Sequence, residues 1–336
     1  MPFRDVVGHR ALVSLLMRSI ARDTMPPSLM FAGPAGVGKR LVAGAVAQTL
    51  NCLTPVRSSA SSVDACGACA ACARIARGVH PDVRVIEPDD KGSIKIDPIR
   101  DLIERVGYRP FEGRLRAVII NEADALVSAA QNALLKTLEE PPSASVFMLV
   151  TARPDALLAT VRSRCPRLRF QPLSADEVAQ VLMQQGKTER DARAAAANAD
   201  GSVQRALAED VDDLIASREI AVRVLAQVIV SDDPRRRLEA AKELVGKTGS
   251  GGASDRQMLA THLRMVASLI RDAALLGVGG DRRALANADL AGTLQKMTEL
   301  VGERGERAFA AVDKGLAALE RNAGVKTVAD WVAVNL

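Results

Sequence analysis

Residues Gly33–Arg40, with the sequence GPAGVGKR, decide the fold of the first half of this chain. An apolar run, Ser28–Ala32, precedes them, and a segment with helical spacing of its apolar residues, Leu41–Leu50, follows them. The order strand, glycine loop and helix, with the pattern G-x-x-x-x-G-K, is typical of a phosphate-binding loop, in which backbone amides and a lysine surround phosphate oxygens. The sequence therefore predicts an α/β domain of the nucleotide-binding type.

The loop departs from the phosphate-binding pattern at its last position. Gly33, Gly36, Gly38 and Lys39 keep the rest of the pattern. Enzymes that hydrolyse nucleotides hold Mg²⁺ with a Ser or Thr hydroxyl at the last position, where this chain has Arg40. Arg40 could instead occupy the pocket, or its charge could replace that of the metal. A chance glycine turn is the other interpretation, and the flanking strand and helix argue against it.

The composition is that of a globular protein. Of the 336 residues, 48% are hydrophobic and 25% are charged, and this length suffices for two or three domains. The chain has neither an apolar stretch of membrane-spanning length nor a signal peptide at Met1–Asp5, so we expect a cytoplasmic protein without a membrane partner. The net charge of +5 permits contact with nucleic acid but equally fits an ordinary solvated surface.

Further apolar runs alternate with helical segments up to about residue 172. The predicted strands are Val83–Ile86, Ala117–Ile120, Ser145–Thr151 and Leu168–Phe170. Continuous apolar runs suit parallel strands that are buried on both faces, so the sequence predicts a doubly wound parallel sheet. After residue 172 only helical spacing remains, which predicts a small helical domain over 173–211 and an all-α domain over 212–336.

Four cysteines follow the helix that begins at the glycine loop. Cys52, Cys66, Cys69 and Cys72 have the spacing C-x13-C-x2-C-x2-C. Four thiolates suit a tetrahedral Zn²⁺, and no catalytic His or Glu accompanies them, so we expect a structural zinc module inserted at about residues 52–75. Four separately buried thiols or an iron–sulfur cluster are the alternatives. Residues 55–65, rich in Ser and small residues, predict a loop.

The strand at Ala117–Ile120 ends in residues that resemble a second nucleotide-binding element. In ATPases an acidic residue at this strand end holds Mg²⁺, and the next residue orients the attacking water. Here Asn121 replaces the metal ligand, while Glu122 is retained. Asp124 lies beyond the strand end and is expected to point elsewhere. Because Arg40 also lacks a ligand atom for the metal, we expect no Mg²⁺ site.

Together with several further motifs, these features resemble the AAA+ clamp-loader subunits of bacterial DNA polymerase III. The further motifs are Phe3–His9, which resembles the adenine-pocket box and includes Val7, the long signature Asn132–Pro142, Thr151 at the sensor 1 position, and the SRC motif Ser163–Cys165. The matching motifs extend from residue 3 to about residue 210. The resemblance implies a AAA+ domain over 1–172, a helical lid over 173–211 and an oligomerisation collar over 212–336.

The resemblance also implies a function in DNA replication. Members of this family form a hetero-pentamer with gamma/tau-type and delta-type subunits, which loads a sliding clamp onto primer-template DNA. Arg164 would act in trans as an arginine finger on ATP held by a neighbouring subunit, although charge alone favours a surface arginine. Gln204 stands in place of the family's sensor 2 arginine. We therefore expect weak or no ATP binding and no intrinsic ATPase activity; an active gamma/tau-type motor subunit is the alternative.

Two surfaces are predicted less specifically. Arginines that could face DNA phosphates, or merely solvent, are Arg100, Arg105, Arg109, Arg114 and Arg116. Apolar helix faces of the collar either carry oligomer contacts or form ordinary core; they include Leu259, Leu263, Val266 and Ile270. A zinc-bearing DNA-binding module unrelated to replication is a third functional hypothesis, and the signature at Asn132–Pro142 argues against it.

Overall fold

The chain forms two compact units. The computed structural model describes residues 1–59, 62–208, 211–230, 233–245, 253–281, 285–287, 290–297, 300, 302–321 and 323–336. The first unit comprises Met1–Val181 with Gly201–Arg205, and the second comprises Leu182–Asp200 with Ala206–Leu336. The domain boundaries expected after residues 172 and 211 stay predictions.

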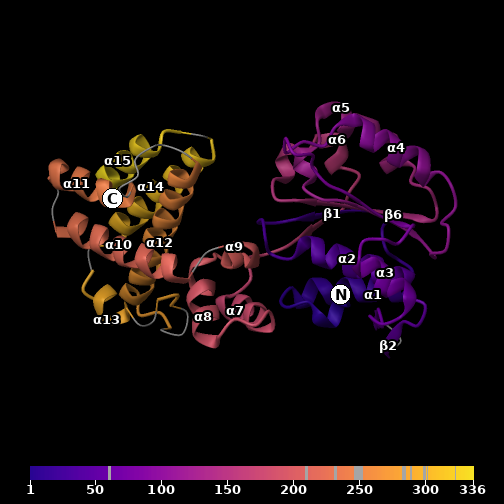
Figure 1. Ribbon diagram of the computed structural model, residues 1–336, viewed down its shortest axis with the longest axis horizontal. Helices are drawn as coiled ribbons and strands as arrows, with labels where there is room; N and C mark the ends of the chain where they lie inside the picture. The colour runs from indigo at the N-terminus through magenta and orange to yellow at the C-terminus, as the bar shows by residue number, and fades with distance from the viewer. Residues whose placement is uncertain are drawn as a thin grey trace. The chain divides into compact units, whose positions relative to one another are not determined.

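A parallel five-stranded sheet forms the centre of the first unit (Figure 1). Its strands are β1 (Ser28–Ala32), β4 (Val83–Ile86), β5 (Arg116–Ile120), β6 (Ser145–Thr151) and β7 (Arg167–Arg169), in the order β4-β5-β6-β1-β7. Strands β1, β5 and β6 are buried along their whole length, as their continuous apolar sequences predict. Because β6 pairs with both β1 and β5, the carboxyl ends of these three parallel strands meet at one edge of the sheet.

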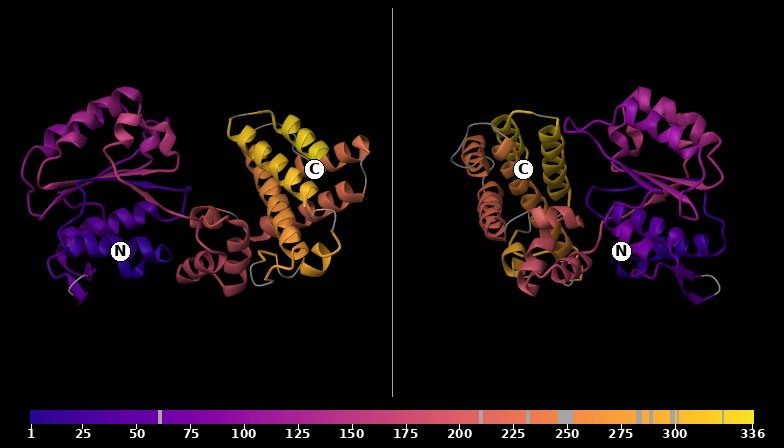
Figure 2. Two further views of the ribbon diagram at one scale, coloured as in Figure 1. Left: turned by 180° about the vertical axis from the view of Figure 1, so that it is seen from behind. Right: turned by 45° about the vertical axis from the view of Figure 1, so that its right-hand side comes forward.

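Helices cover both faces of this sheet (Figures 1 and 2). One face carries α1 (Arg10–Ala21) and α2 (Lys39–Asn51), and the other carries α4 (Ile96–Val106), α5 (Ser128–Glu139) and α6 (Ala159–Arg162). A separate apolar core fills each side: Val42 and Val46 of α2 belong to the first, and Ile99 of α4 and Leu134 of α5 to the second. The predicted α/β fold with a parallel sheet is therefore confirmed.

Residues 52–76 form an insertion between α2 and β4. Strands β2 (Val56–Ser59) and β3 (Ser62–Asp64) pair antiparallel, and α3 (Ala70–Ala76) follows them. The expectation of a loop over residues 55–65 was therefore wrong. These strands are short and carry few apolar residues, so local propensity predicts them poorly; Val63 of β3 is buried.

A capping box begins α7 (Ala175–Gln184). The backbone N–H of Ser174 donates to Glu177 Oε2 at 2.9 Å, and the backbone N–H of Glu177 donates to Ser174 Oγ at 3.2 Å. Helices α8 (Glu189–Asn198) and α9 (Val203–Ala208) follow.

Helices joined by turns make up the described part of the second unit (Figure 2). Its helices after α9 are α10 (Val211–Val230), α11 (Pro234–Val245), α12 (Ala253–Gly277), α13 (Ala291–Leu294), α14 (Glu303–Glu320) and α15 (Val325–Asn335). Four apolar residues of α12 are fully buried and belong to the core of this unit, so their side chains are not exposed to a partner: Leu259, Leu263, Val266 and Ile270. No helix in the described part of the chain has the length and apolar character needed to cross a membrane.

Candidate functional site

The glycine loop between β1 and α2 has the backbone conformation that its sequence predicts. Gly36 and Gly38 have φ angles of +76° and +93°, in the left-handed region that favours glycine. The N–H of Gly33 donates to the carbonyl oxygen of Thr151 at 3.3 Å, which places the loop beside the end of β6. The loop therefore lies at the edge of the sheet where the carboxyl ends of β1, β5 and β6 meet.

Lys39 begins α2 and turns back onto its own loop. Its Nζ donates to the carbonyl oxygens of Gly33 at 2.7 Å and Pro34 at 2.5 Å, and the residue is only 6% exposed. Burial lowers the pKa of Lys39 to about 8, although the carboxylates of Asp124 and Glu122 act in the opposite direction. A bound phosphate would add negative charge beside this ammonium, so the geometry suits an anion.

Arg40 points away from the loop. Its Nη1 lies 3.0 Å from Glu87 Oε1, just after the end of β4, and both side chains are about half exposed. Arg40 therefore forms a surface ion pair with Glu87 and does not place its charge beside Lys39. The helix position that would hold a metal-binding hydroxyl carries no oxygen ligand.

Asn121 and Glu122 follow β5 at the same edge of the sheet. The backbone N–H of Asn121 donates to the carbonyl oxygen of Ile86 at 2.9 Å, which continues the pairing of β5 with β4. Glu122 is exposed and has a φ angle of +49°, so the chain turns sharply here. Of these two side chains only Glu122 carries a charge, and it acts on Lys39.

The sharp turn returns Asp124 to the site, so the expectation that Asp124 points elsewhere was wrong. The short helix η2 (Ala123–Ala125) carries Asp124 to the end of β6, where its Oδ1 accepts a hydrogen bond from Thr151 Oγ1 at 2.8 Å. Arg153 Nε donates to its Oδ2 at 3.0 Å. Burial tends to raise the pKa of Asp124, but the hydrogen bonds from Thr151 and Arg153 outweigh burial and lower it. In the sequence, the only indication of this contact was an acidic residue four positions after the end of the buried strand β5.

The segment Gly201–Arg205 packs against the glycine loop from a distant part of the chain. The backbone N–H of Val203 donates to the carbonyl oxygen of Gly36 at 3.0 Å. A Cβ atom on Gly36 would lie 2.1 Å from Ser202 Oγ and 2.8 Å from Gln204 Cβ. Gln204, expected at the sensor 2 position, therefore lies directly against the loop.

The predicted adenine-pocket box also contacts the loop. His9 Nε2 lies 2.8 Å from the carbonyl oxygen of Val37, and the His9 ring meets Phe170 edge-on at a centroid distance of 4.8 Å. Val7, two residues earlier, is half-buried. The N-terminal segment that contains Val7 and His9 therefore lies beside the glycine loop, as expected for a nucleotide site.

The four cysteines lie together, close enough to hold a metal ion. Their Sγ atoms all lie within 4.8 Å of one another, and those of Cys52 and Cys69 are 4.0 Å apart. Four Zn–S bonds in a tetrahedron separate their sulfur atoms by about 3.8 Å, so the set fits a structural zinc ion. Cys66 Sγ accepts backbone N–H donors from Ala68 at 3.4 Å and Cys69 at 3.2 Å, which stabilises a thiolate. Hydrogen bonds, first from Thr54 and then from these amides, lower the pKa of Cys66 to about 6.

The cysteine module also fastens the N-terminal segment. The backbone N–H groups of Phe3 and Arg4 donate to the Asp64 carboxylate at 2.8 Å and 3.1 Å. The Arg4 guanidinium donates to the carbonyl oxygens of Ala65 at 2.7 Å and Cys66 at 2.8 Å. The module therefore holds the start of the segment that leads to Val7 and His9.

Arg164 lies just after α6 and is 30% exposed. Its Nη1 donates to the carbonyl oxygen of Thr160 at 2.8 Å, and its Nη2 forms an ion pair with Glu139, which belongs to the Asn132–Pro142 signature. In the described residues, its hydrogen-bond partners are Thr160, Ser163 and Glu139. The guanidinium is therefore not bound to its own chain's glycine loop.

Arg116 does not face solvent, which corrects its inclusion among the arginines expected to meet DNA. It is buried, and its guanidinium donates to the carbonyl oxygens of Arg105, Tyr108 and Arg109 and to Asp82 Oδ1. Arg116 is the first residue of β5, which is buried along its whole length, and this position could have indicated that its side chain is buried too. The other four members of the set, Arg100, Arg105, Arg109 and Arg114, are exposed.

Comparison with known proteins identifies the α/β region. Residues 8–174 match the family model described as DNA polymerase III, delta subunit. These residues form a domain of that family. The chain is also 30% identical over 284 residues to DNA polymerase III subunit tau of Salmonella typhimurium, covering 82% of this chain and 41% of tau. It is 33% identical over 218 residues to subunit delta' of Bacillus subtilis, covering 65% of this chain and 64% of delta'.

The chain spans less than two thirds of the length of these relatives. Among solved structures, a gamma subunit-related protein of Thermotoga maritima is similar with a TM-score of 0.37 and 16% identity, over 92% of this chain and all of that chain. The RuvB branch migration motor of the same organism is similar with a TM-score of 0.40 and 17% identity, over 85% of each chain.

Proposed function

We propose that this chain is a delta-prime-type subunit of a DNA polymerase III clamp loader. In this proposal it assembles with gamma/tau-type and delta-type subunits, does not hydrolyse ATP itself, and supplies Arg164 to ATP bound by its neighbour. The assembly loads a sliding clamp onto primer-template DNA. The delta-subunit family domain and the delta' and tau relatives support the general role.

The observation that carries the non-hydrolysing assignment is the state of the two metal-binding positions. Arg40 is turned to Glu87, and Asn121 offers only a neutral amide at the end of β5. The one acidic side chain returned to this edge, Asp124, is already bound by Thr151 and Arg153. Phosphoryl transfer depends on Mg²⁺ to neutralise the charge that develops, so the replacement of both metal-binding residues supports a subunit that does not hydrolyse ATP.

An active ATPase subunit of the gamma/tau type is the second candidate. Lys39, Glu122 and Thr151 are retained at this edge, and tau of Salmonella typhimurium matches 82% of this chain, against 65% for delta'. The purified chain, assayed with ATP and Mg²⁺, separates the two: metal-dependent turnover would establish the ATPase, and its absence is expected for the delta-prime type.

Reconstitution with the partner subunits tests the arginine finger directly. Because a trans arginine contributes roughly 10³–10⁵ in kcat where it acts, Arg164→Ala should abolish the share of ATP hydrolysis contributed by the adjacent site while the complex still assembles. The matched control is Arg162→Ala, which removes an equal charge two residues away, where Arg162 pairs with Asp155 at 2.7 Å. Unchanged hydrolysis in the Arg164→Ala complex, or equal losses for both variants, would contradict the proposal.

Two cofactor proposals accompany this function. We infer one structural zinc held by Cys52, Cys66, Cys69 and Cys72, which native mass spectrometry should detect as one equivalent. We also infer weak or absent ATP binding, because Lys39 Nζ is bound to the carbonyl oxygens of Gly33 and Pro34, and Arg40 and Asn121 stand where the two protein groups that hold Mg²⁺ would be. A low-micromolar dissociation constant by calorimetry would contradict the second inference.

A further inference from the structure

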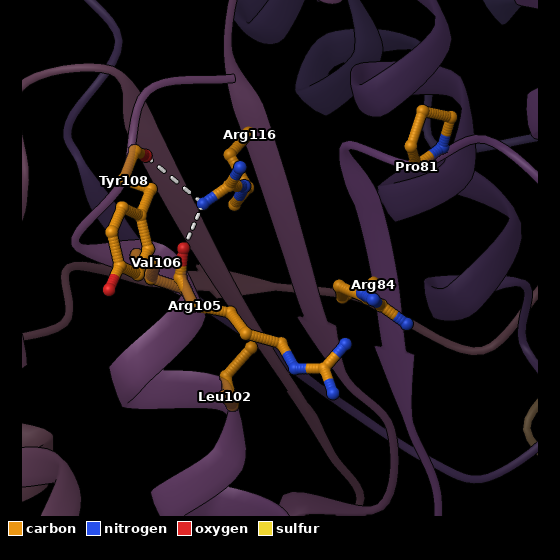
Figure 3. Close-up of a pocket in the computed structure, with 7 residues that line it drawn as sticks. All are labelled: Pro81, Arg84, Leu102, Arg105, Val106, Tyr108 and Arg116. Carbon is orange, nitrogen blue, oxygen red and sulfur yellow. Dashed lines mark hydrogen bonds between the residues drawn. The ribbon is translucent and has the colours of Figure 1, made fainter. Parts of the chain in front are cut away.

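A hollow of about 220 Å³ lies between α4 and the edge strand β4, away from the glycine loop. Its lining includes Arg84 of β4, Leu102 and Arg105 of α4, and Tyr108 and Arg116 from either end of the following loop. Figure 3 shows Arg105 extending from α4 toward the strand that carries Arg84. Side chains from two separate elements therefore bring positive charge to one concavity.

Two of these guanidinium groups have no acidic partner among the residues that the structure describes. Arg116 is satisfied by backbone carbonyl oxygens and Asp82, as the dashed lines in Figure 3 mark in part. Arg84 and Arg105 are exposed and form no ion pair within the described chain. Two like charges beside one hollow repel each other, and an anion placed between them would remove that repulsion.

The acidic residues of α4 do not line the hollow. Leu102, Arg105 and Val106 are spaced three and four residues apart, so they share the helix face that lines it. Asp101 lies four residues before Arg105 and therefore flanks it on the helix surface, but Asp97, Asp101 and Glu104 are not among the lining residues. The lining thus carries arginines and no acidic side chain, although α4 as a whole carries both signs.

The loop beside the hollow exposes two aromatic rings on a fixed backbone. Tyr108 is 77% exposed and Phe111 is 84% exposed, which is unusual for large apolar side chains. The buried Asp82 accepts the backbone N–H groups of Phe111 at 2.7 Å, Glu112 at 2.9 Å and Gly113 at 2.8 Å. Arg116, paired with Asp82 at 3.4 Å, binds the carbonyl oxygens at the start of the loop. A buried ion pair thus holds the backbone that carries the two exposed rings.

We propose that this surface binds single-stranded nucleic acid, with a backbone phosphate between Arg84 and Arg105 and an unpaired base stacked on Tyr108. Positive grooves combined with exposed aromatic rings are how proteins hold single strands without reading sequence. Duplex DNA offers phosphates but keeps its bases stacked inside, so the exposed rings favour a single strand over a duplex. The inference deepens the proposed function by assigning a DNA contact to one surface, yet its test needs neither ATP hydrolysis nor the partner subunits.

Fluorescence anisotropy of the purified full chain with a fluorescein-labelled oligo-dT strand tests the proposal. The double variant Arg84→Ala/Arg105→Ala should reduce the dependence of log K on log salt by about 0.7, since both side chains contact one phosphate and each phosphate contact to a single strand contributes about 0.7. Tyr108→Ala should weaken binding about 5- to 150-fold, while Tyr108→Phe, which retains the ring, should bind as the wild type does.

The control is Arg18→Ala/Arg22→Ala, which removes the same charge from an exposed position on α1 and from the exposed residue just after it, on the opposite face of the sheet. Arg84, Arg105 and Tyr108 line the hollow and are exposed, and the control residues are exposed elsewhere. Unchanged circular dichroism spectra are therefore expected for all the variants. Equal losses in the control, equal affinity for duplex and single strand, or no change with Tyr108→Ala would overturn the proposal. Loss of binding to a purified sliding clamp without loss of oligo-dT binding would identify a protein-docking surface instead and would also overturn it.

Discussion

Replacing Lys39 by methionine should remove a pH-dependent loss of stability that the buried ammonium causes. The wild-type side chain is almost fully covered, and burial lowers its pKa from 10.5 to about 8. Between these two pKa values the unfolded chain binds more protons than the folded chain does. The free energy of unfolding therefore rises as the pH is raised through this window.

The size of the effect follows from the shift. Each pKa unit corresponds to about 1.4 kcal/mol, so a protonated Lys39 lowers the stability by about 3 kcal/mol at pH 7. Raising the pH from 7.5 to 9.5 should recover about 2 kcal/mol of this amount. Methionine has a similar length and no charge, so Lys39→Met should show no such recovery.

Urea unfolding of the full chain, followed by circular dichroism at both pH values, measures the difference. Other ionisable groups are the same in wild type and variant, so their contributions to the pH dependence cancel. A lysine ε-CH₂ resonance that is missing from the Lys39→Met spectrum would report the pKa of Lys39 directly. The same resonance should titrate at higher pH when inorganic phosphate is bound, because the phosphate charge favours the ammonium form.

The matched control is Lys136→Met, at an exposed position on α5. Its unfolding free energy should change with pH in parallel with that of the wild type. A parallel pH dependence for Lys39→Met as well would refute the reasoning, because it would mean that the ammonium is not desolvated in the folded chain.

Three other perturbations have outcomes that the structure defines. Asp82→Ala leaves Arg116 buried without its charge partner and should lower the stability of the α/β unit by about 3–5 kcal/mol, seen in calorimetry as a fall in Tm of roughly 6–20 °C. Asp124 has a pKa below its usual 3.8, so its contribution to the free energy of unfolding is present above about pH 4 and is lost as the pH falls through the lowered pKa. In Asp124→Asn, the free energy of unfolding should therefore fall less steeply with acid than it does in the wild type. Removing metal with a chelator should lower Tm and speed hydrogen exchange at Phe3 and Arg4, which the cysteine module holds.

Each of these has a result that would contradict it. A Tm unchanged by Asp82→Ala would mean that the loop is not held by the buried pair. If the free energy of unfolding falls equally with acid in the wild type and in Asp124→Asn, Asp124 does not contribute to the pH dependence of stability. Exchange that speeds equally in the second unit after chelation would show general unfolding rather than local release of the N-terminal segment.

The sequence by itself determined the elements whose information is local. Continuous apolar runs were enough to locate β1, β5 and β6, because strands buried on both faces carry no polar alternation. The glycines and lysine between β1 and α2 defined the loop conformation, since only glycine readily adopts the φ angles found at Gly36 and Gly38. The spacing of the four cysteines likewise predicted a cluster that the fold then closed.

The tertiary structure decided the pairings between residues that lie far apart in the chain. Asp124 reaches Thr151 because the left-handed turn at Glu122 reverses the backbone, and no periodicity records such a turn. Arg40 pairs with Glu87 of another strand end, and Gln204 returns to Gly36 from 168 positions away. Such contacts depend on strand order and on how each turn aims its side chain, which a linear pattern of apolar and polar residues does not encode.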